Sequence, residues 1–589
     1  MDTQTLPHLN AVQLTAKPNY RSGYLLLFLC LLLSGSALFY LDAVLPLRDL
    51  WFYNALLTVP WRNWLLLPAH LLFPGLPTLS VLPGVHRVRP SSMTIPWLET
   101  GLLLPGFCFL FTGYLLAVRY LPRYLSQRGI ILSTLLLGLL YILIPVATSQ
   151  DLFSYIAYAR MLFVYHFNPL VLPPTAIPHD IIYRYIYWVH QPSIYGPVWV
   201  WLCGILLEIT LHMGFTHVAS MVLMLRLFSL AMHLGSVQLI WSISGYMQRT
   251  TPYSASSQQQ RIRATLAFAW NPFLLFEAAV NAHVDITMLF FVLLSVWLLL
   301  PHMRYPILST ALSAFMLALA SSIKITLIFF IPGLLLFLFL RYMQRWTHIS
   351  LALLAYGGTL LLLYVPFWDG GKILDVLSIN PGAFHAINSP YAVFVYLIAA
   401  LTGSSVLPQA VSAASPIEHI AHSVSMALLG LGYLALLFLA LKTWQRQILF
   451  PALLRWMALV WLFYCALGSP WFWPWYIVTF LGLYALIEAG SVEHGPLARL
   501  FRLPLTVRLL SFSSLCVYCF VSFAPAMNFV AGLKHFTWGD LAGAWLWLVP
   551  LLGLRPSALP RLRRARQGTG YPKEDAPTMI TGKNNIISQ

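Results

Sequence analysis

Long apolar runs recur along almost the whole chain and constrain its fold more than any other feature. Of the 589 residues, 59% are hydrophobic and only 9% are charged. A transmembrane helix needs about 20 consecutive, mostly apolar residues, and these runs lack the alternation of apolar and polar residues that a membrane β-barrel requires. The sequence therefore predicts an all-α fold. We expect a polytopic membrane helical bundle of about 14 transmembrane helices, with interfacial helices in the external loops.

The distribution of charge predicts which segments face the cytoplasm. The chain carries a formal net charge of +17, and its basic residues cluster in short segments between apolar runs and in the C-terminal tail. Such clusters are typical of cytoplasmic segments beside anionic lipid. The excess of positive charge therefore predicts contact with membrane lipids and does not imply nucleic-acid binding.

These patterns divide the chain into four expected segments. They are a cytoplasmic N-terminal tail (1–22), a transmembrane module (23–489) with external loops at 147–195 and 368–418, C-terminal transmembrane helices (490–554) and a basic, partly disordered cytoplasmic tail (555–589). Residues 43–96 are expected to form an external loop with short interfacial helices, because prolines interrupt their apolar pieces. Residues 196–246 are expected to cross an odd number of times, with one piece re-entrant or tilted.

The segment 146–199 combines polar, ionisable and aromatic residues between two hydrophobic runs. The positive-inside rule places it outside, with Asp151 where the preceding run ends. We expect helices at 151–166 and, lying in the interface, at 179–190. A carboxylate at this outer mouth can deprotonate an incoming hydroxyl while nearby cations stabilise a phosphate leaving group. The alternative is that Asp151 only caps the helix that it begins.

A second group of polar residues follows in the sequence WNPFLLFEAAVNAHVD. Asn281, His283 and Asp285 can bind a sugar or orient a base, but they can equally cap the following helix. Lys324 is suited to contact a phosphate, or alternatively to extend its ammonium group to the membrane interface. Glu208 and Glu277 lie within apolar runs and are expected to face the bundle interior.

Aromatic residues gather in the sequence GSPWFWPWY, residues 468–476. An aromatic belt at the membrane interface explains this composition without a ligand, although aromatic faces also stack on sugars and isoprenoid chains. His419 and His422 are spaced for one helical face, yet no third ligand is evident in the sequence, so no metal site is predicted.

Four of these motifs, taken in order, carry a family resemblance. They are QDLFSY (150–155), YGPVW (195–199), WNP (270–272) with NAHVD (281–285), and PW (470–471) with PWY (474–476). The chain resembles the integral-membrane glycosyltransferases of the GT-C superfamily over residues 130–480. It is most similar to the bacterial polyprenol-phosphate-mannose-dependent α-mannosyltransferases that extend cell-envelope lipoglycans.

The resemblance implies an enzyme of the bacterial plasma membrane that transfers a sugar, here mannose, with inversion on the external face. The donor would be a polyprenyl-phosphate sugar, the acceptor a hydroxyl of an envelope glycan or glycolipid, and the general base Asp151. Candidates for binding the donor phosphate or substrate are Arg160, Arg184, His190, Tyr155, Tyr195, His283, Asp285, Lys324 and Trp475.

No cofactor besides the lipid-linked donor is predicted, and dependence on a divalent metal is kept as the alternative. Some relatives carry two acids in the first loop, whereas here Asp151 stands alone between Gln150 and Leu152. This difference weakens a metal-dependent interpretation.

Two other functions are compatible with a helical membrane bundle. A transporter or flippase of lipid-linked sugars would need ionisable residues along a path at mid-bilayer depth and internal repeats of hydropathy, whereas here the ionisable residues crowd the external loops. A polymerase or ligase of envelope glycans would rely on external arginines more than on a single acid. The glycosyltransferase is therefore the favoured hypothesis.

Overall fold

The computed structural model describes residues 20–44, 67–68, 71–72, 95–144, 148–249, 255–301, 304–376, 385–402, 416–444, 449–490, 503–519 and 541–554. Most of these residues are helical, and the described part contains no strand, only single β-bridges that join Ile387 and Asn388 to Trp471. The predicted all-α fold is thus confirmed. Residues 1–553 form one compact unit and 554–589 a second, and the description below concerns the first unit.

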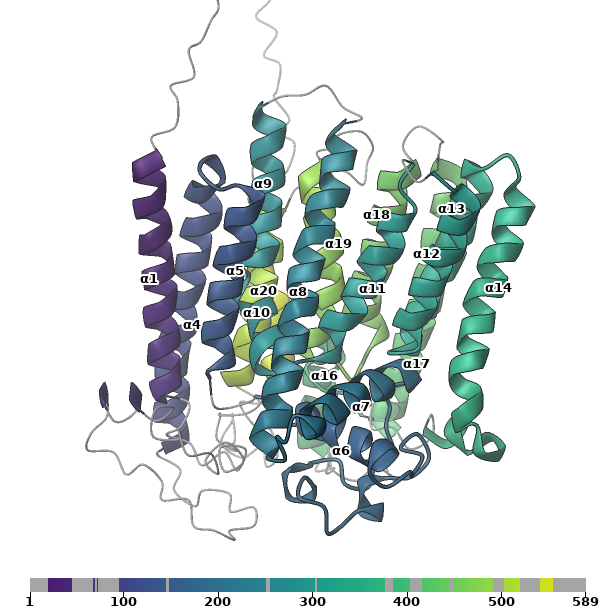
Figure 1. The fold of residues 1–589 in the computed structure, drawn as a ribbon, viewed down its shortest axis with the longest axis horizontal. Helices are drawn as coiled ribbons and strands as arrows, with labels where there is room; N and C mark the ends of the chain where they lie inside the picture. Colours follow the sequence, from purple (N-terminus) through teal and green to yellow (C-terminus); the bar gives the residue numbers. More distant parts are fainter. Residues whose placement is uncertain are drawn as a thin grey trace, which may run out of the picture. The chain divides into compact units, whose positions relative to one another are not determined.

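The longer helices follow one another along the chain (Figure 1). They are α1 (Tyr20–Val44), α4 (Ile95–Tyr120), α5 (Gln127–Ile142), α6 (Asp151–Phe163), α7 (Pro197–His212), α8 (Val218–Arg249), α9 (Ala255–Ala269), α10 (Pro272–Leu275), α11 (Val284–Leu298), α12 (Pro306–Ser321), α13 (Ile331–Arg341), α14 (Arg345–Tyr364), α16 (Pro390–Thr402), α17 (Pro416–Thr443), α18 (Leu449–Phe463), α19 (Val478–Gly490), α20 (Pro504–Tyr518) and α21 (Ala542–Leu548).

Shorter helical turns link several of them. The 3₁₀ turns are Leu121–Arg123, Pro174–Ala176, Tyr183–Tyr185, Ile325–Phe330, Val365–Phe367, Asp369–Asp375, Pro474–Ile477 and Val549–Gly553, and the π turns are Phe276–Val280 and Tyr464–Gly468.

Six helices among the described residues are long and apolar enough to cross a membrane. A seventh candidate is the pair Pro272–Val280 and Val284–Leu298, which bends by 112° at its break. Other apolar helices have only 10–17 residues. A multi-pass membrane protein is therefore confirmed, and the predicted count of about 14 crossings would have to include these shorter helices.

Proline marks where many of these helices begin. Pro197, Pro272, Pro306 and Pro504 each occupy the first turn of their helix. A proline there loses no hydrogen bond, since the first N–H groups of a helix lack partners within it, and its fixed φ suits the helix. The apolar sequence is thereby divided into segments that can change direction.

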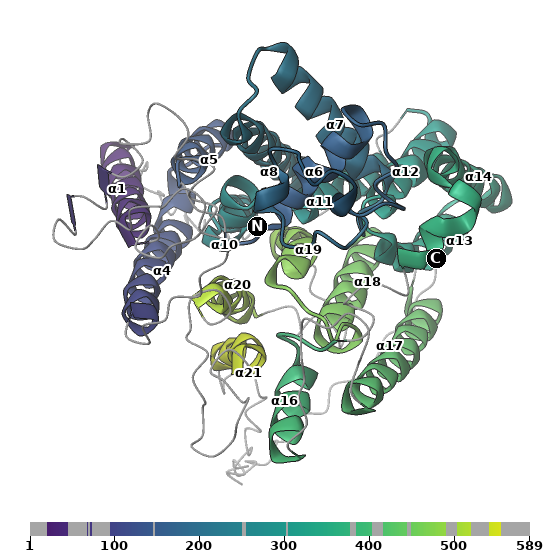
Figure 2. The same cartoon turned by 90° about the horizontal axis from the view of Figure 1, so that it is seen from below.

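One end of the bundle is covered by α6, α7 and the connection between them, which lie below the long helices in Figure 1. Seen from that end in Figure 2, α7 is viewed from its side, whereas α8 and α19 are viewed close to end-on. Of the two apolar pieces in 196–246, only α8 meets the criteria for a span. The odd number of crossings expected there stays a prediction.

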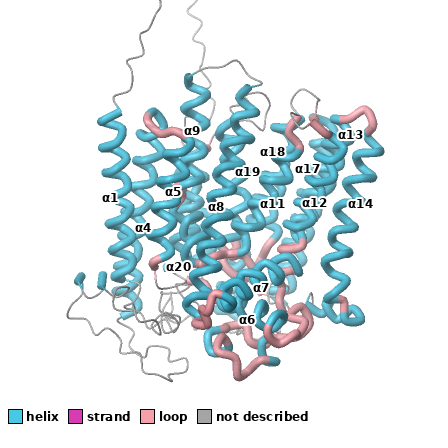
Figure 3. Tube along the Cα trace, viewed as in Figure 1, coloured by secondary structure: helices cyan, strands magenta, loops and turns pink. Residues whose placement is uncertain are grey.

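The connection 164–196 differs from the expected structure. The helix predicted over 151–166 is present as Asp151–Phe163, but the interfacial helix predicted over 179–190 is wrong, because only the 3₁₀ turn Tyr183–Tyr185 forms. The Asp180 carboxylate accepts hydrogen bonds from the Ile182 N–H at 2.9 Å and from the Arg160 guanidinium at 2.8 and 2.9 Å. Such side-chain bonds offer the backbone an alternative to the helix. Figure 3 shows the resulting loop beside α6 and α7.

Two other expectations concern segments that lie largely outside the described residues. Of the loop expected at 43–96, the structure describes only 43–44, 67–68, 71–72 and 95–96. Of the loop expected at 368–418, it describes 368–376, 385–402 and 416–418, and these include the helix α16.

Candidate active site

Asp151 begins α6 and lies in a largely buried cluster of polar groups. The residue is 8% exposed, and its Oδ2 atom accepts a hydrogen bond from the Tyr195 hydroxyl at 2.8 Å. The N-cap of α6 is Gln150, and no side chain caps this helix. Capping, the alternative considered for Asp151, is therefore not what its carboxylate does.

Tyr195 is held so that it can only donate to this carboxylate. Burial, together with the nearby Asp151 charge, raises the pKa of the Tyr195 hydroxyl well above its usual value, so the phenol stays protonated. Its ring meets the Tyr155 ring edge to face at 5.0 Å, and Tyr155 in turn meets Trp199 at 5.1 Å. These buried aromatic rings fix the position from which Tyr195 orients the carboxylate.

A sharp break between α10 and α11 brings a second group of polar residues to the same place. The helix loosens into the π turn Phe276–Val280, and Ala282 then takes a positive φ of 51°. A left-handed alanine is uncommon and marks a turn that its surroundings impose. The chain bends by 112° at this break, and Glu277, Asn281, His283 and Asp285 lie in or next to it. Each of these four residues is fully buried.

The His283 ring lies between two carboxylates. Its Nδ1 atom is hydrogen-bonded to Glu277, and its Nε2 atom lies 3.9 Å from Oδ2 of Asp151. The ring stacks on Trp475 with centroids 4.0 Å apart. His283 stands at the N-cap of α11 without making a side-chain cap, so the capping alternative does not describe it either.

Trp475 belongs to this cluster and not to an exposed belt. It is 5% exposed, and on its other side it stacks against Trp473 with the ring planes 7° apart. An interfacial aromatic belt would place such rings toward lipid headgroups. Here the Trp475 indole stacks on His283 and on Trp473 inside the cluster.

Lys324 supplies the cation of the cluster. Its Nζ atom donates to both carboxylate oxygens of Asp285 at 2.8 Å and lies 4.3 Å from the centroid of the Tyr476 ring. The Lys324 side chain is 16% exposed, so it does not extend to the interface as the alternative supposed. The N–H of Gly196 donates to the carbonyl of Ile323 at 3.1 Å, which ties the Tyr195 segment to the Lys324 segment.

The three cations expected in the first loop have different surroundings. The Arg160 guanidinium forms an ion pair with Asp180 at 2.7 Å. Arg184 is exposed, and its guanidinium lies 4.9 Å from the centroid of the Tyr185 ring. His190 is also exposed. Among the predicted cations, Lys324 is thus the one that the structure joins to the acidic cluster.

Two residues of the cluster were not predicted as part of a site. Glu277 was expected only to face the bundle interior, and Tyr518 was not considered. Tyr518, on α20, donates to Oε1 of Glu277 at 2.5 Å. The sequence held a signal for Glu277, since an acid in an apolar run is a functional candidate, but none for Tyr518. The matching expectation for Glu208 is wrong, because its side chain is 35% exposed beside His212.

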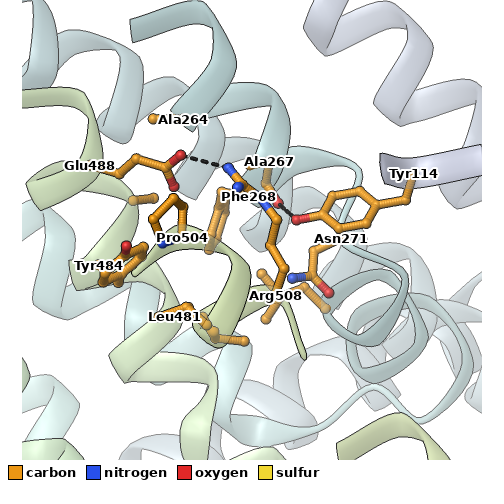
Figure 4. Close-up of a pocket in the computed structure, with 13 residues that line it drawn as sticks. Tyr114, Ala264, Ala267, Phe268, Asn271, Leu481, Tyr484, Glu488, Pro504 and Arg508 are labelled. Atoms are coloured by element: carbon orange, nitrogen blue, oxygen red, sulfur yellow. Dashed lines mark hydrogen bonds and ion pairs between the residues drawn. The ribbon is translucent and has the colours of Figure 1, made fainter. Parts of the chain in front are cut away.

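A separate pocket, of about 300 Å³ of empty space, lies between α4, α9, α19 and α20. Figure 4 shows the Arg508 guanidinium reaching the Glu488 carboxylate, at 2.5 Å, with Tyr114 and Asn271 nearby. None of the residues predicted for the site lines this pocket. It is therefore distinct from the cluster around Asp151.

The helical membrane bundle with its buried cluster of acids, an imidazole and a lysine agrees with the architecture expected of a GT-C type membrane glycosyltransferase. Residues 75–340 match the family described as alpha-(1->6)-mannopyranosyltransferase, N-terminal domain. This match, over just under half of the chain, confirms the resemblance drawn from the sequence motifs and supports a glycosyltransferase activity. No curated protein and no solved structure matches the chain.

Most of the cluster lies within the matched residues. Asp151, Glu277, His283, Asp285 and Lys324 fall between 75 and 340. Trp475 and Tyr518 come from later helices and complete the same pocket.

Proposed function

We propose that this protein transfers mannose from a polyprenyl-phosphate donor to a hydroxyl of an envelope glycan or glycolipid, on the external face of a bacterial plasma membrane. The acceptor oxygen would attack the anomeric carbon as the bond to the donor phosphate breaks, which inverts the anomeric centre. The acceptor proton goes to Asp151, and the electron pair of the broken bond leaves with polyprenyl phosphate.

The observation that carries this proposal is the setting of the Asp151 carboxylate. Its side chain is 12% exposed and is held by the Tyr195 hydroxyl. It lies at the end of the bundle covered by the loop 164–196, where the charge pattern predicts the external face. A base must come within hydrogen-bond reach of the hydroxyl that it deprotonates, and an oriented, partly exposed carboxylate supports this role for Asp151.

Lys324 is the best candidate to bind the donor phosphate. An ammonium group stabilises the charge that develops on a phosphate leaving group, and Asp285 fixes its position through two hydrogen bonds. Arg160 is less suited, because its guanidinium is already paired with Asp180. Arg184 and His190 are exposed on the loop 164–196. They would contact the donor or acceptor only at the outer surface of this loop.

The remaining predicted residues would orient the base or contact the substrate. Tyr195 orients the base, Tyr155 buttresses Tyr195, and Trp475 offers an aromatic wall beside His283. A sugar ring passing the pocket could stack on such a wall, as sugars do on aromatic faces. The isoprenoid chain would lie in a groove between helices, where apolar contact supplies affinity.

The test is transfer of radiolabelled mannose from a synthetic polyprenyl-phosphate donor to membrane glycan acceptors, by the full-length protein and by Asp151→Asn. We expect the variant to bind the donor and to transfer no mannose. Asp369→Asn is the matched control, because this exposed acid pairs only with Lys372 at 3.4 Å in the described structure and should leave transfer unchanged. Transfer by Asp151→Asn at the wild-type rate would refute the assignment of the base.

A further inference from the structure

We propose that Glu277 is a positioning residue that presents His283 to Asp151 as the next acceptor of the proton. This inference rests on the proposed function. In the first step the acceptor O–H bond breaks and its proton passes to Asp151. In the second step the proton moves from Asp151 to Nε2 of His283, so that Asp151 is again a base and His283 is an imidazolium beside the Glu277 carboxylate. His283 later returns the proton to water.

The hydrogen bonds around Glu277 present its side chain as an acceptor. The Asn281 Oδ1 atom accepts from the backbone N–H of Thr148 at 3.1 Å, and a backbone N–H can only donate. The Asn281 amide nitrogen must therefore face Glu277, where it donates to Oε2 at 3.1 Å. Tyr518 donates to Oε1. With Asn281 donating to Oε2 and Tyr518 to Oε1, both Glu277 oxygens act as hydrogen-bond acceptors.

The state of Glu277 decides the tautomer of His283. Because the carboxylate can only accept, the Nδ1 atom of His283 must carry the hydrogen in the bond between them. A neutral ring then has its lone pair on Nε2. The same logic applies wherever a buried acid orients a histidine that takes up a proton.

The Nε2 atom of His283 has the features of a reserved proton acceptor. It is buried, and within the described structure it has no hydrogen-bond partner. Leaving a buried polar atom unpaired is destabilising, and the role proposed here gives this atom a partner during the reaction. Oδ2 of Asp151 lies 3.9 Å from it. An acceptor hydroxyl or a water at about 2.8 Å from both atoms would bridge them.

The fold keeps the His283 ring in this orientation. Trp475 stacks on its face, and the His283 N–H donates to the carbonyl of Glu277 at 2.9 Å. The left-handed Ala282 immediately precedes it. When Nε2 takes up a proton, the adjacent Glu277 charge stabilises the imidazolium in surroundings where water cannot. Tyr518 extends this arrangement to α20, outside the matched family domain.

The test compares steady-state transfer by the full-length wild type, Glu277→Gln, His283→Asn and the double variant. His283→Asn can still donate to Glu277 but lacks Nε2. We expect Glu277→Gln to lower kcat about 100-fold or more, by analogy with the loss of the acid that orients a catalytic histidine, with the donor KM within about threefold of the wild type. In the His283→Asn background, Glu277→Gln should change kcat less than about threefold, because the residue acts through His283.

A purely structural role for Glu277 gives a different result. Its replacement would then lower the amount of folded protein and reduce kcat by the same factor in both backgrounds, which would overturn the proposal, as would an unchanged kcat in Glu277→Gln. Glu418→Gln is the matched control, because it also breaks a buried pair of glutamate and histidine, with His385 at 3.0 Å. It should lower thermal stability similarly while keeping kcat per folded molecule within about threefold.

A second variant serves if Glu277→Gln does not fold. Tyr518→Phe removes one donor to Glu277 and should lower kcat several-fold in the wild-type background but not in His283→Asn. Equal effects in the two backgrounds would overturn the proposal. The Asp151→Asn variant distinguishes failure of the proposed function from failure of this inference alone. If Asp151→Asn transfers mannose normally, the base is misassigned and the proposed function fails. If it is inactive while Glu277→Gln and His283→Asn remain fully active, only this inference fails.

Discussion

Lys324 donates from its Nζ atom to both carboxylate oxygens of Asp285, at 2.8 Å each. The two residues come from the start of α11 and from the segment that follows α12, and the Asp285 side chain is fully buried. Because the carboxylate is inaccessible while the Lys324 side chain is 16% exposed, the pair holds a cation in a fixed position within the cluster. Under the proposed function, the donor phosphate would contact this ammonium.

We predict that Lys324→Gln weakens binding of polyprenyl phosphate, the product of the proposed reaction. Loss of the charge should raise its inhibition constant about tenfold or more, since hydrogen bonds to charged groups contribute about 1.5–3 kcal/mol. Inhibition by uncharged polyprenol should not change. Lys372→Gln is the control, because this lysine is 64% exposed in its side chain. Equal inhibition constants for polyprenyl phosphate in wild type and Lys324→Gln would contradict the assignment.

We predict that Gly196→Ala disrupts the pocket. A Cβ atom at this position would lie 2.0 Å from the backbone oxygen of Ser322 and 2.6 Å from the Tyr364 hydroxyl. Backbone cannot move aside as a flexible side chain does, so overpacking here should cost about 1–3 kcal/mol. The segment that carries Tyr195 should shift away from Lys324. The melting temperature in detergent and the rate of mannose transfer should both fall.

Gly358→Ala is the control for that substitution. A Cβ at this position in α14 meets nothing within 4 Å, and alanine is favoured over glycine inside a helix by about 1 kcal/mol. Its melting temperature should stay the same or rise, with transfer unchanged. A Gly196→Ala protein as stable and active as Gly358→Ala would show that the tight contact is not required.

The sequence predicted those features of the fold and site that depend on local pattern. The apolar runs predicted the helices, and Asp151 was assigned to the start of a helix because a hydrophobic run ends just before it. The grouping of His283 with Asp285 was visible as NAHVD. In each case the signal lies within a few residues, so that helical period and hydrophobicity suffice.

What could not be predicted depends on contacts between distant segments. The bond between Tyr518 and Glu277 joins residues 241 positions apart, and no local pattern indicates it. Arg160 was proposed for phosphate because of its charge, but its partner Asp180 became evident only from the folded loop. The hydrogen bonds of the Asp180 side chain also explain why the helix predicted over 179–190 does not form. They favour a turn, although the apolar residues of this segment recur with helical period.

We predict that Trp475→Ala lowers kcat more than it lowers the fraction of folded protein. The indole is the wall against which the His283 ring stacks, so its loss frees the imidazole to rotate away from Asp151. Trp475→Phe keeps an aromatic face and should retain most of the activity. Trp346→Ala, at a position 66% exposed, should leave kcat unchanged. An active Trp475→Ala protein would argue that Glu277 alone positions the ring.

Because Arg160 and Asp180 form an ion pair, we predict that the loop 164–196 loses its ordered structure at low pH. Burial opposes ionisation of Asp180, but hydrogen bonds from Arg160, Ile182 and Tyr165 outweigh it and lower the pKa of this carboxyl below its usual value. A group whose pKa is lower in the folded state stabilises the fold above its unfolded pKa, about 3.9. That contribution is lost as the pH falls through the lower, folded value.

We therefore expect the loop in the wild type to keep its slow amide hydrogen exchange at neutral pH and to lose it only below about pH 4. Asp180→Asn should show fast exchange in the loop already at neutral pH, because it leaves the Arg160 guanidinium, whose side chain is 11% exposed, without its partner. Breaking a buried pair from one side costs about 3 kcal/mol. Amide exchange in α11 should be the same in both proteins, because the substitution is expected to affect only the loop 164–196. Slow loop exchange in Asp180→Asn at neutral pH would show that apolar contacts, such as the stacking of Phe153 on Tyr185 at 5.5 Å, hold the loop without the ion pair.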